Sequence, residues 1–209
     1  MDEYLSEQEQ WERVKQWIRQ NVIWVAAGIG IAALGVGGWR WWQGQQEQQY
    51  LKAGAVYAQI VDAFDKKDVA GVTKYADQLV RDYPRSGYAD QAELAAARIL
   101  LDNTQHAAAI ERLRHVLETS KDAELRLVAR LRIARIQIDQ KKPDEALATL
   151  TAAETGAFAP RFAEVRGDAL LAKGDREGAL KAYREAQAAG SAAVDADLLT
   201  LKINDLSSS

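Results

Sequence analysis

The chain has 209 residues, with 27 basic and 30 acidic side chains and no cysteine. The resulting net charge of −3 excludes the strongly basic footprint of a nucleic-acid-binding protein. The lack of cysteine excludes a disulfide framework and any thiolate site.

Residues 4–20 are predicted to form a short amphipathic helix. Ser6 and Glu9 have the spacing of a capping box, in which each side chain satisfies a free backbone N–H of the first helical turn. One face of the helix is apolar and carries Trp11, Val14, Trp17 and Ile18. We expect residues 1–20 to form a cytoplasmic segment that lies on the membrane surface or, alternatively, docks with a partner.

The next segment, residues 21–42, is predicted to be a transmembrane helix. No charged residue occurs from Val22 to Trp39, and a helix of that length measures about 27 Å, close to the roughly 30 Å hydrocarbon core of a bilayer. All six tryptophans lie between residues 11 and 42, on both sides of the apolar run. Indole and guanidinium groups favour the headgroup level, so the predicted membrane-interface residues are Trp17, Trp24, Trp39, Arg40, Trp41 and Trp42.

Other interpretations of this segment are weaker. A signal peptide has a shorter apolar core and small residues at its cleavage site, whereas this run ends in Trp-Arg-Trp-Trp. The string GIGIAA matches a dinucleotide-binding fingerprint, but that fingerprint requires a βαβ unit around it. Small residues in a span can let a second helix approach closely, or can simply be tolerated; the candidates are Ala26, Gly30, Ala33 and Gly37.

The basic residues on the two flanks of the span indicate its orientation. Arg13, Lys15 and Arg19 precede the apolar run, whereas Arg40 and Lys52 follow it. Lys and Arg accumulate on the cytoplasmic side of a membrane protein. This excess of three over two favours a cytoplasmic N-terminus, with the larger C-terminal part on the far side.

Residues 43–206 are predicted to form a solenoid of helical hairpins. Three stretches align, beginning at Ala97, Ala134 and Gly167, at steps of 37 and 33 residues. Each has a small residue, then an alanine twelve residues later (109, 146, 179), a larger residue four further on (113, 150, 183) and a small or β-branched residue three after that (116, 153, 186). This spacing, with polar turns between the helices, is the tetratricopeptide pattern, in which small residues let paired helices approach closely.

The two ends of the solenoid are less regular. A degenerate first hairpin is expected over residues 50–82, with Tyr75 in the aromatic position, and a capping helix over residues 194–206. Residues 207–209 are expected to be a frayed tail. The predicted fold class is therefore all-α: one transmembrane helix followed by a tetratricopeptide-like solenoid.

The sequence contains no recognisable catalytic constellation, and we expect neither an enzyme nor a cofactor. His106 and His115 lack metal-ligand spacing with each other, and neither a P-loop nor a G-x-S-x-G motif is present. The densest basic cluster is interpreted as a solvated face, or as partners of glutamates on neighbouring helices: Arg126, Arg130, Arg132 and Arg135.

The first helix of each hairpin is expected to line the groove of the solenoid. The repeat register then predicts the groove residues Leu94, Arg98, Leu101, Leu131, Arg135, Ile138, Glu164, Asp168 and Leu171. Apolar rows flanking arginines suit a peptide segment with apolar side chains and a carboxylate. Alternatively, several of these leucines belong to the packed core.

The whole chain resembles the YfgM family of ancillary SecYEG translocon subunits. The resemblance rests on the approach EQWERVKQWIRQN, the exit GWRWW, the degenerate repeats and the final helix LLTLKINDL. It implies a single-pass bacterial inner-membrane protein with a periplasmic repeat domain, positioned beside the SecYEG translocon. It also implies a membrane-anchored periplasmic chaperone of the prolyl-isomerase type as a partner, with secreted or membrane client polypeptides as further candidates.

The expected function is that of an adaptor that holds a chaperone or an emerging chain near the translocation channel. One alternative is a holdase-type chaperone that binds unfolded clients directly. Another is a general scaffold of inverted topology, with the repeat domain in the cytoplasm.

Overall fold

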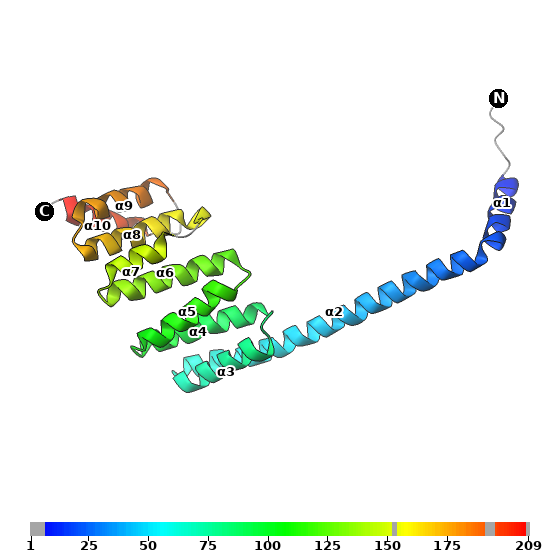
Figure 1. Ribbon diagram of the computed structural model, residues 1–209, viewed down its shortest axis with the longest axis horizontal. Coiled ribbons are helices and arrows are strands. Elements are labelled where there is room, and N and C mark those ends of the chain that lie inside the picture. Colours follow the sequence, from blue (N-terminus) through cyan, green and yellow to red (C-terminus); the bar gives the residue numbers. More distant parts are fainter. Residues whose placement is uncertain (1–6, 152–153, 191–194, 208–209) are drawn as a thin grey trace, which may run out of the picture. The chain divides into compact units, whose positions relative to one another are not determined.

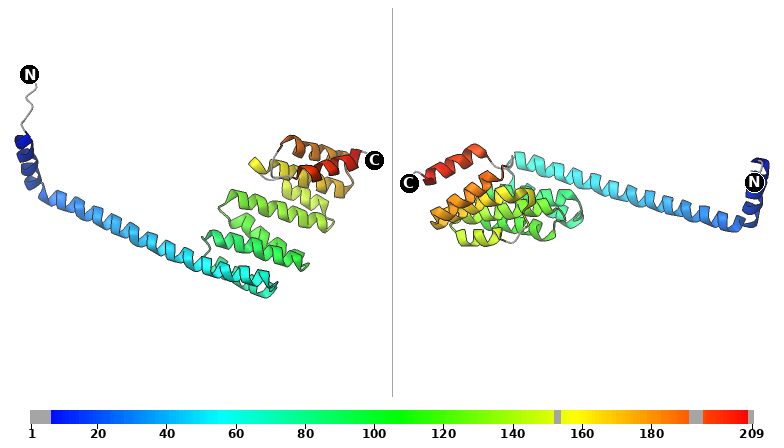
Figure 2. Two further views of the ribbon diagram at one scale, coloured as in Figure 1. Left: turned by 180° about the vertical axis from the view of Figure 1, so that it is seen from behind. Right: turned by 90° about the horizontal axis from the view of Figure 1, so that it is seen from above.

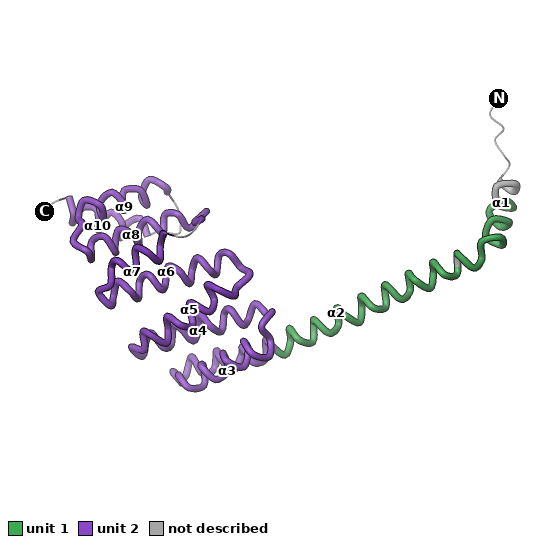
Figure 3. Tube along the Cα trace, viewed as in Figure 1, with its two compact units in different colours: residues 1–52 green, residues 53–209 purple. Residues whose placement is uncertain are grey.

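The computed structural model describes residues 7–151, 154–190 and 195–207, and it divides the chain into two compact units, Met1–Lys52 and Ala53–Ser209 (Figure 3). Ser6 of the predicted capping box lies outside the described residues. The repeat unit begins at Ala53 rather than at residue 43, because the side chains of residues 43–52 are exposed to solvent whereas Ala53 is buried. Each unit is described separately below.

The first unit consists of helix α1 (Glu7–Gln20) and most of helix α2 (Val22–Asp65). The two helices are separated at Asn21, whose side-chain amide donates a hydrogen bond to the carbonyl of Trp17 (2.9 Å). The predicted interface residues and the small residues of the span are all exposed, and a β-carbon added at Gly30 or Gly37 would meet no atom within 4 Å. Among the described residues, α2 alone is long and apolar enough to cross a membrane, and none of its apolar stretch is buried in the protein. Hydrocarbon is the solvent that suits such a surface.

The second unit is built from helices that pack in chain order (Figures 1 and 2). After the end of α2 come α3 (Val69–Asp82), α4 (Gly87–Asp102), α5 (His106–Thr119), α6 (Ala123–Asp139), α7 (Pro143–Leu150), a short 3₁₀ turn (Gly156–Phe158), α8 (Ala159–Lys173), α9 (Arg176–Ala188) and α10 (Ala196–Ser207). No strand occurs among the described residues. The predicted all-α class, with an apolar N-terminal helix followed by helical repeats, is confirmed.

The small residues of the repeat pattern lie where the paired helices meet. Ala97, Ala134 and Gly167 are buried on the first helices α4, α6 and α8. Their counterparts on the second helices are buried too: Ala109, Ala146, Ala179, Leu113, Leu150, Tyr183, Val116 and Ala186. Ala153 lies outside the described residues. The sequence period therefore reflects helix packing within each hairpin.

Left-handed residues mark the same turn in all four hairpins. Lys67, Thr104, Lys141 and Gly174 have φ values of +57°, +59°, +61° and +91°. Their spacing places Lys67 in register with the three later turns, so the end of α2 and α3 form the first hairpin. In this register Ala76, which is fully buried, occupies the position of Leu113. The assignment of Tyr75 to that position was therefore one residue too early.

Thr104→Gly is expected to stabilise the repeat unit by about 1 kcal/mol. A β-branched side chain at positive φ is strained, whereas glycine adopts this conformation without a steric cost, as Gly174 already does in the last hairpin. The measurement is urea unfolding of the full-length chain in detergent micelles. Gly174→Ala is the matched reciprocal variant and should lower stability by a similar amount; a loss of stability in Thr104→Gly would contradict the prediction.

Four apolar clusters form the core, and each joins one hairpin to the helix that follows it. The first contains Ile60, Val72, Leu79 and Ile99, from α2, α3 and α4. The second joins α4 and α5 to α6, the third joins α6 and α7 to α8, and the fourth joins α8 and α9 to α10. The unit is therefore stabilised mainly by contacts between neighbours, as expected for a solenoid.

Candidate interaction groove

A groove of about 440 Å³ opens between the end of α2, α4 and α6. Its lining is mainly apolar and also contains three charged side chains, Asp65, Arg98 and Arg132. The residues that line it are Tyr57, Ile60, Val61, Phe64, Asp65, Gln91, Leu94, Ala95, Arg98 and Arg132. An apolar pocket with a few convergent polar groups is the usual form of a binding site.

The structure brings only two of the predicted groove residues, Leu94 and Arg98, into this groove. Leu131 is 5% exposed and belongs to the third core cluster, so the prediction that it lines an open groove was wrong. Leu101 and Ile138 are partly buried and pack against core clusters. Leu131, Leu101 and Ile138 therefore fit the alternative interpretation, in which several of the predicted groove residues form part of the packed core.

The basic side chains at the groove differ in their partners. Arg98 pairs with Asp102 on the next turn of α4 (3.0 Å). Arg132 donates from Nη1 to the carbonyl oxygen of Leu94 (3.4 Å), and it has no carboxylate within 4.0 Å among the described residues. Partial burial, together with the positive charges of Arg98 and Arg135, lowers the pKa of Arg132. Arg132 is therefore a guanidinium at the groove that no carboxylate within 4.0 Å pairs with among the described residues.

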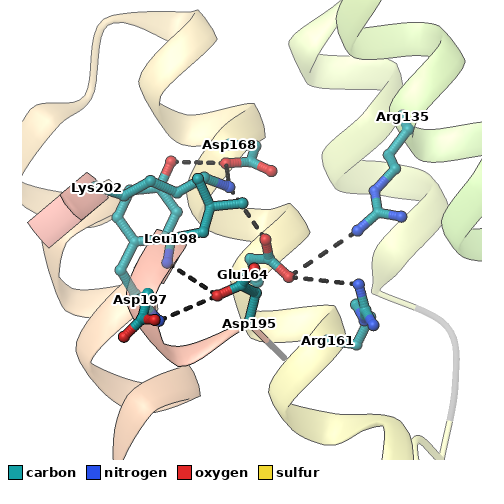
Figure 4. Close-up of polar contacts among 9 residues, drawn as sticks. Arg135, Arg161, Glu164, Asp168, Asp195, Asp197, Leu198 and Lys202 are labelled. Atoms are coloured by element: carbon teal, nitrogen blue, oxygen red, sulfur yellow. Dashed lines mark hydrogen bonds and ion pairs between the residues drawn. The ribbon is translucent and has the colours of Figure 1, made fainter. Parts of the chain in front are cut away.

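The predicted residues on α8 form a separate ionic cluster that holds the last helix (Figure 4). Lys202 of α10 contacts Glu164 (3.1 Å) and Asp168 (2.7 Å), and the phenol of Tyr183 donates a hydrogen bond to Asp168 (2.8 Å). Arg135 lies at the other side of Glu164, at 4.0 Å. Glu164 is 5% exposed, so the prediction that it lines the same open groove as Arg98 was wrong.

The repeat register did not predict this ionic cluster. The register assigned Glu164 and Asp168 to the groove, but the capping helix α10 covers that part of α8. Leu171, the last predicted residue, is exposed near the end of α8 and does not line the groove between α2, α4 and α6. Two of the clustered arginines have backbone partners: Arg126 donates to the carbonyl of Ser120 (2.7 Å) and Arg130 to that of Thr149 (3.0 Å). Their role is to satisfy loop and helix-end carbonyls.

A buried ionic contact connects α3, α4 and α5, and the sequence pattern did not reveal it. Arg112 of α5 donates to Glu93 of α4 (3.2 Å) and also pairs with Asp77 of α3. Burial raises the pKa of Glu93, although the charge of Arg112 opposes that shift. No local spacing signals such a contact, because the three residues meet only when the helices pack.

Arg112→Met is expected to lower the free energy of unfolding by about 2 kcal/mol at neutral pH. The substitution leaves the buried Glu93 carboxylate without its cation, and an unpaired buried charge is costly. Because the pKa of Glu93 is already raised above 4.5 and rises further in the variant, the folded state binds more protons than the unfolded state just above pH 4.5. Stability therefore falls as pH rises through this window, and the deficit of the variant should shrink as the pH is lowered towards 4.5.

Urea unfolding of the full-length chain at pH 5 and pH 7.5 measures this effect. Arg114→Met is the matched control, because Arg114 lies on the same helix in an exposed pair with Glu111. It should change stability by less than about 0.5 kcal/mol at both pH values. Equal losses at the two pH values for Arg112→Met would contradict the role assigned to Glu93.

The described residues contain no group of three or more His, Cys, Asp or Glu side chains that could hold a metal ion. His106 and His115 each have a buried Nδ1 without a hydrogen-bond partner in this part of the chain. His115 lines a shallow pocket next to Glu93 and Arg112, but no second histidine accompanies it there. The surface with the clearest capacity for recognition is therefore the groove between α2, α4 and α6.

Comparison with known proteins places these features in a wider group. Residues 15–208 match the model of a tetratricopeptide repeat-like domain. The chain is 30% identical to a protein of Escherichia coli strain K12 over 210 residues, covering 99% of this chain and all of that protein. It is 32% identical to a protein of Neisseria gonorrhoeae over 208 residues (99% and 100%) and 30% identical to one of Aggregatibacter actinomycetemcomitans over 202 residues (97% and 98%). Each of these relatives is named "Ancillary SecYEG translocon subunit".

Proposed function

Because this chain belongs to the family of ancillary SecYEG translocon subunits, which is built on a tetratricopeptide repeat-like domain, we propose that it is a membrane-anchored adaptor of the Sec translocon. The main support for this proposal is that the similarity to the Escherichia coli relative extends over 99% of the chain, including the apolar part of α2 as well as the repeats. Its role is to hold a periplasmic chaperone of the membrane-anchored prolyl-isomerase type, or an emerging chain, close to the channel.

A single membrane anchor supports this role physically. The apolar part of α2 confines the protein to the plane of a membrane, which raises its effective concentration near membrane partners without requiring strong contacts. The repeat unit offers a surface suited to protein segments, as helical solenoids generally do. Binding and positioning, rather than chemistry, account for these features.

The proposed location is the bacterial inner membrane, with the N-terminus in the cytoplasm and the repeat domain in the periplasm. The excess of Lys and Arg before the apolar run supports this orientation. A reporter enzyme that is active only outside the cytoplasm, fused after Ser209, tests it. Activity is expected; an inactive but intact fusion would instead favour a scaffold that faces the cytoplasm.

Association with the translocon is tested by purification from native membranes. The full-length chain, carrying an affinity tag and solubilised in mild detergent, is expected to retain SecYEG subunits. The matched control replaces residues 21–42 with an unrelated single span of equal length, which separates contacts made by the anchor from those made by the repeats. Absence of SecYEG from the wild-type preparation, after cross-linking in intact membranes, would refute the proposal.

Direct chaperone activity is a second candidate function, and the apolar walls of the groove favour it. Val61 is 46% exposed there, although it is a large apolar residue of a folded unit. The full-length chain reconstituted in lipid nanodiscs, without any partner, would then suppress aggregation of an unfolded model client. Suppression only in the presence of an added chaperone would leave the adaptor role as the better account.

A further inference from the structure

Among the arginines at the groove, Arg132 is the one without an ion pair in the described part of the chain. Arg98, which lines the same groove, already pairs with Asp102, and Arg135 lies 4.0 Å from Glu164. Arg132 makes a hydrogen bond only to a backbone carbonyl in the described part of the chain. Asp65 also lines the groove but makes no ion pair within 4.0 Å of Arg132 among the described residues. The groove therefore has one guanidinium whose preferred partner, a carboxylate, is missing.

The other lining residues of the groove offer an apolar surface. Tyr57, Val61 and Phe64 project from the last turns of α2, and Leu94 and Ala95 come from α4. Tyr57 is held in place by the ring of Tyr88, with 5.3 Å between the ring centroids. Aromatic and branched side chains on two packed helices form a pre-ordered wall, which lowers the entropic cost of binding.

We propose that this groove binds an acidic–apolar segment of a partner polypeptide, with a side-chain carboxylate of that segment on Arg132 and its apolar side chains against Tyr57, Val61 and Phe64. This inference deepens the proposed function and rests on it, because it assumes that the groove receives polypeptide. It assigns to the groove residues of α2 and α6 that the repeat register did not include.

The chemistry of the groove favours a carboxylate on a peptide over a phosphorylated ligand or a nucleic acid. A single available guanidinium matches one carboxylate, whereas Asp65 and Asp102 nearby would repel a polyanion. The apolar wall also has no role in binding a phosphate backbone, but it suits leucine or phenylalanine side chains that lie next to the acid.

Fluorescence anisotropy with two synthetic probes tests the inference. The acidic probe is a fluorescein-labelled peptide amide of sequence Gly-Leu-Glu-Phe-Leu-Glu-Gly, and the neutral probe carries Gln in place of both Glu residues. The full-length chain is reconstituted in nanodiscs of phosphatidylcholine, which carries no net charge. The acidic probe is expected to bind at least about 5-fold more tightly than the neutral probe, since a hydrogen bond to a charged group adds more than one to a neutral group.

Variants locate the effect. Arg132→Gln should weaken binding of the acidic probe about 5-fold and leave binding of the neutral probe unchanged, whereas Val61→Asn should weaken both. Arg114→Gln is the matched control, because it removes an exposed arginine from α5 and should change neither affinity. Circular dichroism of each variant establishes that the helices remain folded.

Two results would overturn the inference: no binding of the acidic probe, or equal loss of both probes in Arg132→Gln. The association with SecYEG is measured separately in the same variant. If Arg132→Gln keeps SecYEG but still binds the acidic probe as tightly as the wild-type chain does, the groove inference fails while the proposed function stands. If the wild-type chain does not retain SecYEG, the proposed function fails independently of the probe measurements.

Discussion

Tyr183→Ala is expected to destabilise the repeat unit by about 3–5 kcal/mol, because it removes the largest fully buried side chain of the last hairpin. The ring lies directly against Gly167 of α8, where a β-carbon would overlap it. Its hydroxyl donates to Asp168, which in turn binds Lys202 of α10. The substitution therefore leaves a cavity and weakens the contact between α8 and the capping helix.

The loss should be local before it is global. Tyr183 belongs to the cluster that joins α8, α9 and α10, so hydrogen exchange is expected to accelerate in these helices and to change little in α3 and α4. Tyr75→Ala is the matched control, since Tyr75 is only partly buried at the edge of the first cluster. It should cost about 1 kcal/mol and leave exchange in α9 unchanged. Uniform acceleration along the whole repeat unit in Tyr183→Ala would contradict the nearest-neighbour account of the core.

Replacing Ile31 and Leu34 together with aspartate is expected to abolish stable membrane insertion. Both residues lie near the middle of the apolar run, and their side chains are exposed, at 71% and 78%. An aspartate at the centre of a span costs about 2.5–3.5 kcal/mol on insertion scales, so the pair costs about 6 kcal/mol. The measurement is the fraction of full-length chain that remains in membranes after carbonate extraction.

Gln45→Asp with Gln48→Asp is the matched control for this experiment. It introduces the same two charges at the same spacing, but in the polar stretch of α2 beyond Trp42. Acidic residues contribute little to membrane orientation, so this variant should insert as the wild type does. If the Ile31/Leu34 variant were retained in membranes as fully as this control, α2 would not be a membrane span.

The hairpin register could be predicted from the sequence because it depends on residue size. Ala97 with Ala109, and Gly167 with Ala179, are small for a local reason: the two helices of one hairpin must approach closely. The first hairpin was harder to place, since Val72 and Ala76 stand where later repeats have an alanine and a larger residue. Its register became clear from the backbone, through the positive φ of Lys67.

The groove was harder to predict because it depends on contacts between repeats. Leu131 and Leu94 occupy equivalent positions in the assumed register, yet Leu131 is packed by α7 and α8 while Leu94 faces the open groove. Tyr57 and Val61 went unrecognised because the groove register was carried only onto the three aligned stretches and not onto the first helix of the degenerate hairpin expected over residues 50–82. Arg112 and Glu93 are paired only through the packing of α5 on α4, which no periodicity encodes.

The short connection between the apolar stretch and the compact repeat unit limits what this protein can reach. Only residues 43–52 lie between Trp42 and Ala53, and the eleven residue steps from Trp42 to Ala53 cover at most about 40 Å of fully extended chain. If Trp42 lies at the bilayer boundary, as the sequence predicts, Ala53 thus remains within that distance of the boundary, whatever angle the repeat unit adopts. The short connection would therefore favour ligands near the membrane. A polypeptide segment that has just left a channel mouth is close to the start of the repeat unit, whereas the same segment deep in the aqueous compartment is not.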